Sequence, residues 1–398
     1  MDLTILALAS YDKGHDFLRE AKQAGARVLL LTSASIKDEA EFPREGYDEI
    51  FYMPDNDKVW NREDTIKAVS YLARTERLDR IVPLDDFDLE IAASLREHLR
   101  VPGMGETTVR YFRDKLAMRM KAREAGILVP DFVHVLNHAQ VNEYMDKVPA
   151  PWVLKPRSMA GAIGIRKIEN RDHFWQVANE LGDEQSQYLL ERFVPGDIFH
   201  VDSIVSERVL RFSVVSGYGR PPMDVAHGGG VFTTRLLERG TALEQGLQAL
   251  NWRLLAALGL VRGIAHAEYI QGRDGQLYFL ETAARVGGAH IADLVECATG
   301  INLWREWAKI EIDGGAGRYT APTTGSDYAG LIVCLARDEW PNVDMYQDPE
   351  IVWRLRRRHH AGFIVRSSSQ PRIEQLLTEF SERAGRDYLA VAPPKEHR

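Results

Sequence analysis

The first hundred residues alternate between short apolar runs and segments with helical spacing, and this alternation narrows the folds open to the chain. The runs LTILALAS and RVLLLTSA flank a helix pattern that stops at Gly25, and a second helix pattern precedes the run DRIVPLDD. Strands that alternate with helices pair in parallel and carry helices on both faces of their sheet. The sequence therefore predicts a parallel β/α domain over residues 1–110. Its first turn, ASYDKG, lacks the G-x-G-x-x-G pattern of dinucleotide sites, which argues against NAD binding there.

Length and charge narrow the class of protein. At 398 residues the chain is too long for one ordinary core, so we expect two or three domains. The net charge of −8 argues against a nucleic-acid partner, which needs a basic face. Two cysteines, Cys297 and Cys334, lack metal-ligand spacing and favour a reducing compartment. The sequence shows neither a signal peptide nor an apolar run of the roughly 18 residues that span a membrane, so we expect a cytoplasmic protein without a membrane partner.

Two carboxylates occupy a predicted hairpin within residues 266–291. Glu268 lies in one strand-like run and Glu281 ends the next, with a turn rich in Gly and Asp between them. Like charges that face each other destabilise a sheet unless a cation lies between them. Mg²⁺ prefers oxygen ligands and keeps substrate phosphates in its shell, and Mn²⁺ is an alternative ion. The pair predicts a metal-bound phosphate with Arg285 beside it, while two solvated glutamates on an exposed hairpin are the alternative.

A loop with small residues follows the run PWVLK. Lys155 ends this run, and Gly161 and Gly164 lie in the loop, whose exposed N–H groups can cover phosphates. The loop is not a Walker A loop, because no G-K-[ST] sequence opens a helix there. Alone, the segment is equally typical of a hairpin with a small-residue tip.

Three more segments carry polar groups that suit a nucleotide only in combination. The strand-like run YLLERFVPGD provides Glu191 and an apolar exit that suits an adenine ring. Lys115 lies in a helix pattern, where an exposed lysine is the ordinary case. His200 and Asp202 share one face of a strand, where a hydrogen-bonded histidine is the ordinary case.

In their order along residues 100–291, these motifs resemble the ATP-grasp superfamily. The resemblance implies that Lys115 and Lys155 contact the phosphates of ATP and that the loop with Gly161 and Gly164 covers them. A first domain of parallel strands and helices before these motifs agrees with the same superfamily.

The resemblance also assigns the nucleoside end of the site. It implies that the adenine lies at a hinge formed by Glu191, Phe193 and Val194. The run FHVDSIV is similar to the biotin-carboxylase-like branch, which implies that His200 lies near the ribose.

The metal carboxylates of the superfamily match Glu268 and Glu281, and its arginine matches Arg285. The superfamily usually has E-x-N-x-R at the second carboxylate, whereas this chain reads Glu281-Thr-Ala283-Ala-Arg285. The amide oxygen that helps to hold a second Mg²⁺ is missing. We therefore expect one well-held ion.

The expected fold combines α/β and α+β parts. A pre-ATP-grasp β/α domain covers residues 1–110, an ATP-grasp domain of two α+β subdomains covers 111–315, and a small closing α/β subdomain covers 316–398.

The resemblance implies an ATP-dependent carboxylate–amine ligase of the L-amino acid ligase type, which activates a small acid as an acyl phosphate and joins it to an amine. The segment RVGGAHIADL, with Gly287 and Gly288, is similar to the substrate end of such ligases. The segment MDVAHGGGVFTTRLL is expected to form a loop near the acceptor, where His227 and Arg235 could meet a carboxylate. A homodimer is one option for its assembly.

Two other functions stay open. One is a biotin-carboxylase-like or purine-pathway carboxylase, although no biotin-attachment segment is evident. The other is a nucleotide-binding regulator that has lost catalysis, which Ala283 alone supports. The sequence names neither the acid nor the amine.

Overall fold

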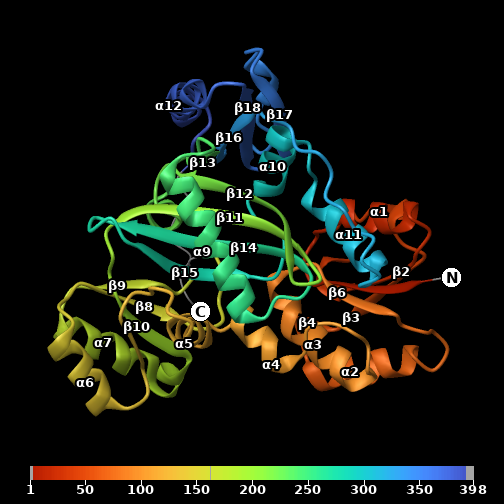
Figure 1. Ribbon diagram of the computed structural model, residues 1–398, viewed down its shortest axis with the longest axis horizontal. Helices are drawn as coiled ribbons and strands as arrows, with labels where there is room; N and C mark the ends of the chain where they lie inside the picture. Colours follow the sequence, from red (N-terminus) through yellow and green to blue (C-terminus); the bar gives the residue numbers. More distant parts are fainter. Residues whose placement is uncertain (1–2, 162, 391–398) are drawn as a thin grey trace.

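The computed structural model describes residues 3–161 and 163–390, without the side chains of residues 226 and 227. Within these residues the strands form sheets of four, four and eight strands and one two-stranded pair. Figure 1 shows the eight-stranded sheet running from the middle to the top of the molecule, with the two four-stranded sheets below it on opposite sides.

The N-terminal part is a parallel sheet between helices, as predicted. Its elements are β1 (Thr4–Ala9), α1 (His15–Gln23), β2 (Arg27–Ser33), β3 (Glu49–Met53), β4 (Asp55–Asn56), β5 (Val59–Trp60), α2 (Arg62–Leu72), β6 (Arg80–Pro83), α3 (Leu89–Leu99) and α4 (Glu106–Val109). The sheet order is β3-β2-β1-β6, and every pair is parallel. Both faces are buried, since Ile5 and Ala7 pack toward α1 while Leu6 and Leu8 pack toward α2 and α3.

The second part is a four-stranded antiparallel sheet. Its elements are α5 (Lys115–Glu124), β7 (Phe132–His134), α6 (His138–Lys147), β8 (Trp152–Pro156), β9 (Arg166–Ile168), α7 (Arg171–Leu181) and β10 (Tyr188–Arg192). The order is β7-β10-β8-β9. Helices α6 and α7 cover the face that carries Trp152 and Leu154. Because side chains alternate along a strand, Val153 and Lys155 of β8 turn to the opposite face.

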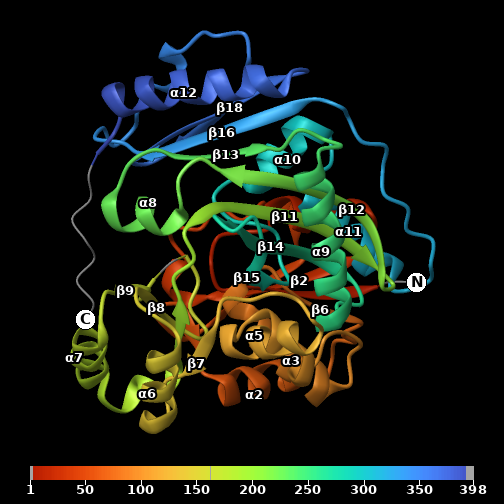
Figure 2. The ribbon, with the colours of Figure 1, turned by 60° about the vertical axis from the view of Figure 1, so that its left-hand side comes forward.

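The third part is an antiparallel sheet of eight strands. Its elements are β11 (Gly196–Ser206), β12 (Val209–Tyr218), α8 (Pro222–Gly228), β13 (Phe232–Leu236), α9 (Ala242–Leu258), β14 (Gly263–Gly272), β15 (Leu277–Ala283), α10 (Ile291–Thr299), α11 (Leu303–Asp313), β16 (Tyr328–Leu335), β17 (Ile351–Arg357), β18 (His360–Ser367) and α12 (Gln370–Asp387). The order is β15-β14-β11-β12-β13-β16-β18-β17, and α12 covers β16 and β18 (Figure 2). Of the helices that the structure describes, none has the length and apolar character that a membrane crossing requires.

The C-terminal strands extend the central sheet. Strand β13 pairs with β16, so residues after 316 share backbone hydrogen bonds with the strands before them. The domain boundaries at residues 110 and 315 stay predictions.

One segment differs from its expected form. The start of MDVAHGGG was expected to be a loop, but residues Pro222–Gly228 form the short helix α8. Pro222 suits a first helical turn, and Gly229 and Gly230, with φ of 68° and 123°, let the chain leave the helix.

The carboxyl ends of β1 and β6 meet at Asp88. Its Oδ2 accepts a hydrogen bond of 3.1 Å from the backbone N–H of Ser10, and the residue is 1% exposed. Burial, reinforced by the charge of Asp85, raises the pKa of Asp88 to about 7. The folded protein therefore holds a proton that the unfolded chain releases near pH 4, and this group's contribution to stability falls as the pH rises from about 4 to 7.

We predict that Asp88→Asn stabilises the protein by about 2–4 kcal/mol at pH 8 and by little at pH 4. The asparagine stays uncharged, and its Oδ1 can still accept the hydrogen bond from Ser10. Denaturant unfolding at the two pH values measures this difference. An equal effect at both would show that Asp88 keeps an ordinary pKa.

Candidate active site

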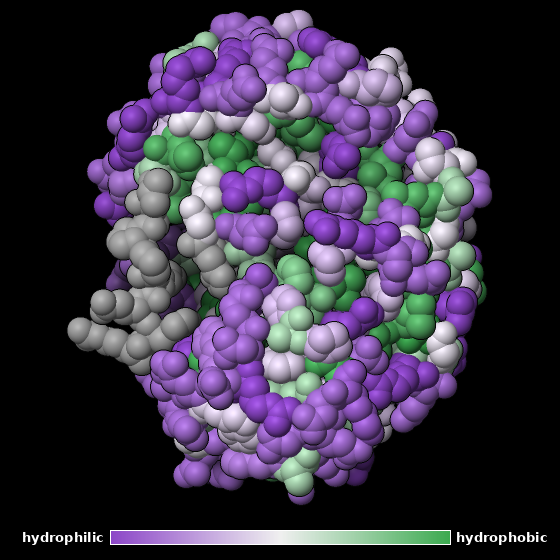
Figure 3. All heavy atoms as spheres, turned by 90° about the vertical axis from the view of Figure 1, so that its left-hand side faces the viewer, coloured by the Kyte–Doolittle hydropathy of each residue, from purple (hydrophilic) through white to green (hydrophobic). Residues whose placement is uncertain are grey.

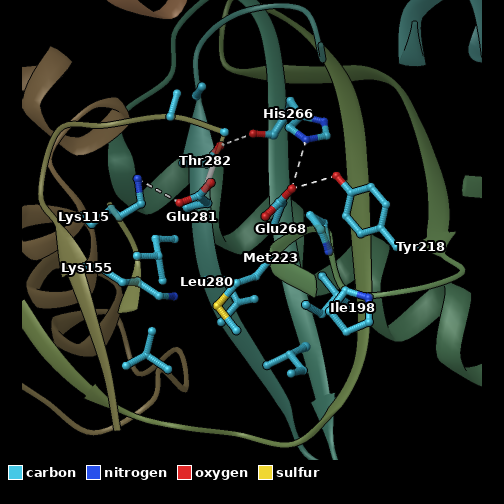
Figure 4. Close-up of a pocket in the computed structure, with 18 of the residues that line it drawn as sticks. Lys115, Lys155, Ile198, Tyr218, Met223, His266, Glu268, Leu280, Glu281 and Thr282 are labelled. Atoms are coloured by element: carbon cyan, nitrogen blue, oxygen red, sulfur yellow. Dashed lines mark hydrogen bonds and ion pairs between the residues drawn. The ribbon is translucent and has the colours of Figure 1, made fainter. Parts of the chain in front are cut away.

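Glu268 on β14 and Glu281 on β15 are direct partners across a hairpin, as the sequence predicts. The hydroxyl of Tyr218 donates a hydrogen bond of 2.7 Å to Glu268 Oε1, and Lys115 Nζ lies 3.0 Å from Glu281 Oε2 (Figure 4). Burial opposes ionisation of Glu281, but the charges of Lys115 and Lys155 outweigh it and hold its pKa at about 2. Glu281 is therefore a carboxylate at neutral pH, paired with a cation.

Lys115 is the first residue of α5, and it is buried instead of solvated. The carboxylate of Asp114 caps the helix by accepting a hydrogen bond of 2.9 Å from Leu116 N. Lys115 Nζ also donates a hydrogen bond of 2.5 Å to Met159 O. The start of the helix thus directs the ammonium between Glu281 and the loop after β8.

Lys155 belongs to a buried group of three charges. Its Nζ forms an ion pair with Glu191 on the neighbouring strand β10, and Glu191 also accepts from Arg119 Nη2 at 2.9 Å. Arg119 and Glu191 are 0% and 2% exposed. Burial opposes ionisation of Glu191, but the charges of Arg119 and Lys155 keep its pKa below the usual range.

Sequence reasoning missed Arg119. It lies four residues after Lys115, on the same face of α5, so helical spacing was an available signal.

The loop after β8 covers one side of the site. Gly161 lines the cavity with φ of 68°, and Arg113 Nη2 donates to Ser158 O at 2.7 Å. Gly164 does not line the cavity; a Cβ there would lie 2.8 Å from the side chain of Pro156, so glycine lets the loop return close to β8. Residue 162 lies outside the described residues.

These groups surround a cavity of about 600 Å³, a size that suits a nucleotide. Phe193 and Val194, which with Glu191 form the predicted adenine hinge, line it, and the hinge stays a prediction. Its other apolar walls include Met118, Pro130, Val153, Ile165, Ile198, Ile270 and Leu280. Figure 3 shows apolar residues inside a recess with polar surroundings, on the side of the molecule that carries β8 and β9.

Arg285 and Gly288 line the cavity near the start of α10, and Met223 and Asp224 line it from α8, the helix between β12 and β13. Arg285 Nη1 donates to Val286 O at 2.9 Å, and its buried Nε has no hydrogen-bond partner among the described residues. Since a buried guanidinium N–H normally finds an acceptor, Arg285 has capacity for a further oxygen.

Besides Gly164, three predicted residues do not line the cavity. His200 is 0% exposed and bonds to Asp202 and Thr234, which leaves no surface for a ribose. Arg235 turns to α12, where its Nη2 lies 3.0 Å from Glu374. Gly287 lies behind the cavity wall, against Asp202.

The geometry therefore does not support substrate or ribose contacts for these residues. His200 lies on a buried strand face and makes its hydrogen bonds within the sheet. The ion pair with Glu374 directs the side chain of Arg235 away from the cavity. The side chain of His227 lies outside what the structure describes.

Two other cavity residues escaped the sequence reasoning. His266 lies two positions before Glu268, on the same strand face, so the period of two was a signal. Burial opposes its protonation, but Asp202 outweighs burial and raises the pKa of His266 to about 9. Tyr218 comes from β12 and has no local signal; burial, then Glu268, raises its pKa well above the usual value.

The hairpin fits one Mg²⁺. Glu268 and Glu281 present carboxylate oxygens, the donors that a hard cation prefers. Ala283, which is 7% exposed, offers no side-chain oxygen where the superfamily usually carries an amide. These two glutamates would hold a single ion together with phosphate oxygens.

Comparisons with known proteins agree with this geometry. The family model of the ATP-grasp domain matches residues 112–288. An L-arginine-specific L-amino acid ligase of Bacillus subtilis is 26% identical over 241 residues, covering 59% of this chain and 58% of the relative. The chain spans about half the length of the first relatives that it matches in sequence.

Solved structures share the fold along nearly the whole chain. An L-amino acid ligase from Bacillus licheniformis superposes with a TM-score of 0.77 at 17% identity, covering 98% of this chain and 99% of that one. An N5-carboxyaminoimidazole ribonucleotide synthetase from Thermus thermophilus gives 0.72 at 18% identity, with the same coverage of 98% and 99%. The order of the motifs, the family model and the shared fold agree that residues 112–288 form an ATP-grasp domain.

Proposed function

We propose that this protein is an ATP-dependent carboxylate–amine ligase that activates a small carboxylic acid, an amino acid or a peptide-like acid, and joins it to an amine. One observation carries the proposal: two lysines, two opposed glutamates and Arg285 converge on one cavity whose remaining walls are largely apolar. The similarity to an L-amino acid ligase supports the choice of substrate class.

The residues suit phosphoryl transfer, which depends on positioning and charge neutralisation more than on an activated side chain. An oxygen of the acid attacks the γ-phosphorus of ATP, which gives an acyl phosphate and ADP. The amine then attacks the acyl carbon, displaces phosphate and loses a proton.

Each of these side chains, charged or apolar, has a role in the proposed reaction. Lys115 and Lys155 neutralise phosphate oxygens, and Phe193 and Val194 pack against the adenine. Mg²⁺ bound by Glu268 and Glu281 would add positive charge at the phosphates. Arg285 holds an oxygen of the acyl group, because its guanidinium lines the cavity and has an N–H without a partner among the described residues.

The test is ADP release over a panel of paired amino acids, with bicarbonate as a separate arm and mass spectrometry of the product. We expect ADP and a condensed product for at least one pair. A carboxylated product in the bicarbonate arm would favour a carboxylase, and ATP binding without turnover in every arm would favour a regulator.

We predict that Lys155→Ala weakens ATP binding by about 1.5–3 kcal/mol, the usual loss for one hydrogen bond to a charged group. Glu191 keeps two hydrogen bonds from Arg119, of 3.1 and 2.9 Å, in this variant, so losing Lys155 should cost less stability than losing Arg119. Calorimetry measures the affinity, and Lys121→Ala on the exposed side of α5 is the matched control. Unchanged affinity in Lys155→Ala would contradict the phosphate contact.

A further inference from the structure

A buried chain of polar contacts leads from the interior of the large sheet to Glu268. It begins at Asp202 on β11, which is 0% exposed. Asp202 Oδ2 pairs with His200 Nδ1 at 2.8 Å, and Oδ1 pairs with His266 Nδ1 at 2.9 Å. His200 is anchored further by Thr234, 2.8 Å from its Nε2. Both oxygens of Asp202 are therefore used to hold imidazole rings.

The other nitrogen of His266 faces the site. His266 Nε2 lies 3.6 Å from Glu268 Oε1, the same oxygen that accepts the hydrogen bond from Tyr218 (Figure 4). Within the described residues, Glu268 Oε2 has no hydrogen-bond or ion-pair partner. Two neighbours thus restrain one oxygen of Glu268, which leaves the other available to a ligand.

Strand geometry explains why this chain of contacts forms. Asp202 is the register partner of His266 across β11 and β14, and His200 is the partner of Glu268. Residues two apart on one strand share a face, so all four side chains gather on the same side of the sheet. Asp202 does not line the cavity, and it reaches the cavity only through His266.

The segment after Arg285 closes over this group. A Cβ at Gly287 would lie 2.9 Å from Asp202 Oδ1 and 3.0 Å from His266 Nδ1. The ligand atoms of His200, Asp202 and His266 lie within 4.8 Å of one another, a spacing that a metal ion could also use. Their present contacts are hydrogen bonds, and the backbone of Gly287 fills the adjacent space, so the geometry favours a support for Glu268.

We propose that Asp202 is a positioning residue that, through His266, fixes the orientation of the Glu268 carboxylate for a divalent cation at the nucleotide phosphates. This inference rests on the proposed function, because it takes Glu268 as a metal ligand. A group that orients a metal ligand from behind usually contributes about 10–100-fold to metal affinity.

The test measures Mn²⁺ binding directly, by electron paramagnetic resonance in the presence of a non-hydrolysable ATP analogue. We expect Asp202→Asn to weaken Mn²⁺ binding by about 10-fold, while its affinity for the analogue without divalent metal stays at the parent value. His266→Asn should give a similar loss, and the double variant should lose little more, because both residues act through one path. Thr234→Val, at the far end of the chain of contacts, is the matched control and should change Mn²⁺ affinity by less than about 3-fold.

Parent-level Mn²⁺ affinity in folded Asp202→Asn would overturn the inference. A metal ion that the purified parent protein retains and Asp202→Asn loses would also overturn it, because Asp202 would then be a metal ligand itself. If Asp202→Asn does not fold, Gly287→Ala decides the matter, because its Cβ displaces the same pair without removing a charge. Gly287→Ala should also weaken Mn²⁺ binding several-fold, and parent-level Mn²⁺ affinity in this variant would contradict the positioning role of Asp202. A parent protein that binds no nucleotide would contradict the proposed function itself, which separates the two failures.

Discussion

Glu281→Gln is expected to lower turnover by about 10²–10³-fold, the loss typical when one group that stabilises transition-state charge is removed. The amide is a weaker ligand for a divalent cation than the carboxylate, and it no longer balances Lys115. The variant should therefore also need more Mg²⁺ for its half-maximal rate. Steady-state rates at saturating ATP, titrated with Mg²⁺, measure both effects.

Arg285→Ala should behave differently from Glu281→Gln. It should leave the Mg²⁺ dependence of any remaining ATP turnover nearly unchanged and abolish acyl-phosphate formation, because the oxygen charge that develops in transfer loses its partner. Trapping the acyl phosphate with hydroxylamine detects this loss. Glu124→Gln, at the exposed end of α5, is the matched control for Glu281→Gln, because it also replaces a glutamate with glutamine. If Glu281→Gln keeps the parent's rate and Mg²⁺ dependence, the hairpin is not a metal site.

Arg119→Met is expected to lower the free energy of unfolding by about 3–5 kcal/mol, because it leaves a buried carboxylate short of a partner. Arg119 is 0% exposed and joins three elements: it pairs with Glu191 on β10 and donates to Leu280 O on β15 from its place on α5. Lys155 would then be the one remaining cation beside Glu191 among the described contacts of that carboxylate. Denaturant unfolding measures the change.

The double variant Arg119→Met/Glu191→Met tests the cause. With Arg119 and Glu191 both removed, no carboxylate is left buried without Arg119. Lys155 also loses its partner, but it lines the cavity, where water can solvate it, so much of the lost stability should return. A double variant less stable than Arg119→Met would show that packing, and not the unpaired charge, explains the loss.

Local patterns predicted a large part of the fold and several site residues. Alternating strand and helix patterns predicted the parallel N-terminal sheet, and its strands are buried on both faces. A two-residue period on each side of a short turn predicted that Glu268 faces Glu281. In each case the signal lies within a few dozen residues, where backbone geometry leaves few alternatives.

Contacts between distant segments could not be predicted in the same way. Periodicity shows which side chains share a face, as with Lys115 and Arg119 or with His200 and Asp202, but not what that face meets. The local pattern favoured solvent for Lys115, whereas Lys115 is buried against Glu281. For His200 the local pattern favoured a hydrogen-bonded strand-face histidine, which the structure shows, while the family resemblance implied a ribose contact, which the enclosed position of His200 does not support. The partner of a face depends on packing across the whole chain.

The sequence therefore determined the kinds of element, the order of the motifs and the pairing within the hairpin, since these depend on local spacing and turn residues. The tertiary structure determined which charges are neutralised and which remain available: Arg119 with Glu191, Asp202 with His266, and Tyr218 with Glu268. These pairs join residues 50 to 72 positions apart. A buried charge is stable only beside its partner, and sheet pairing and helix packing bring that partner into place.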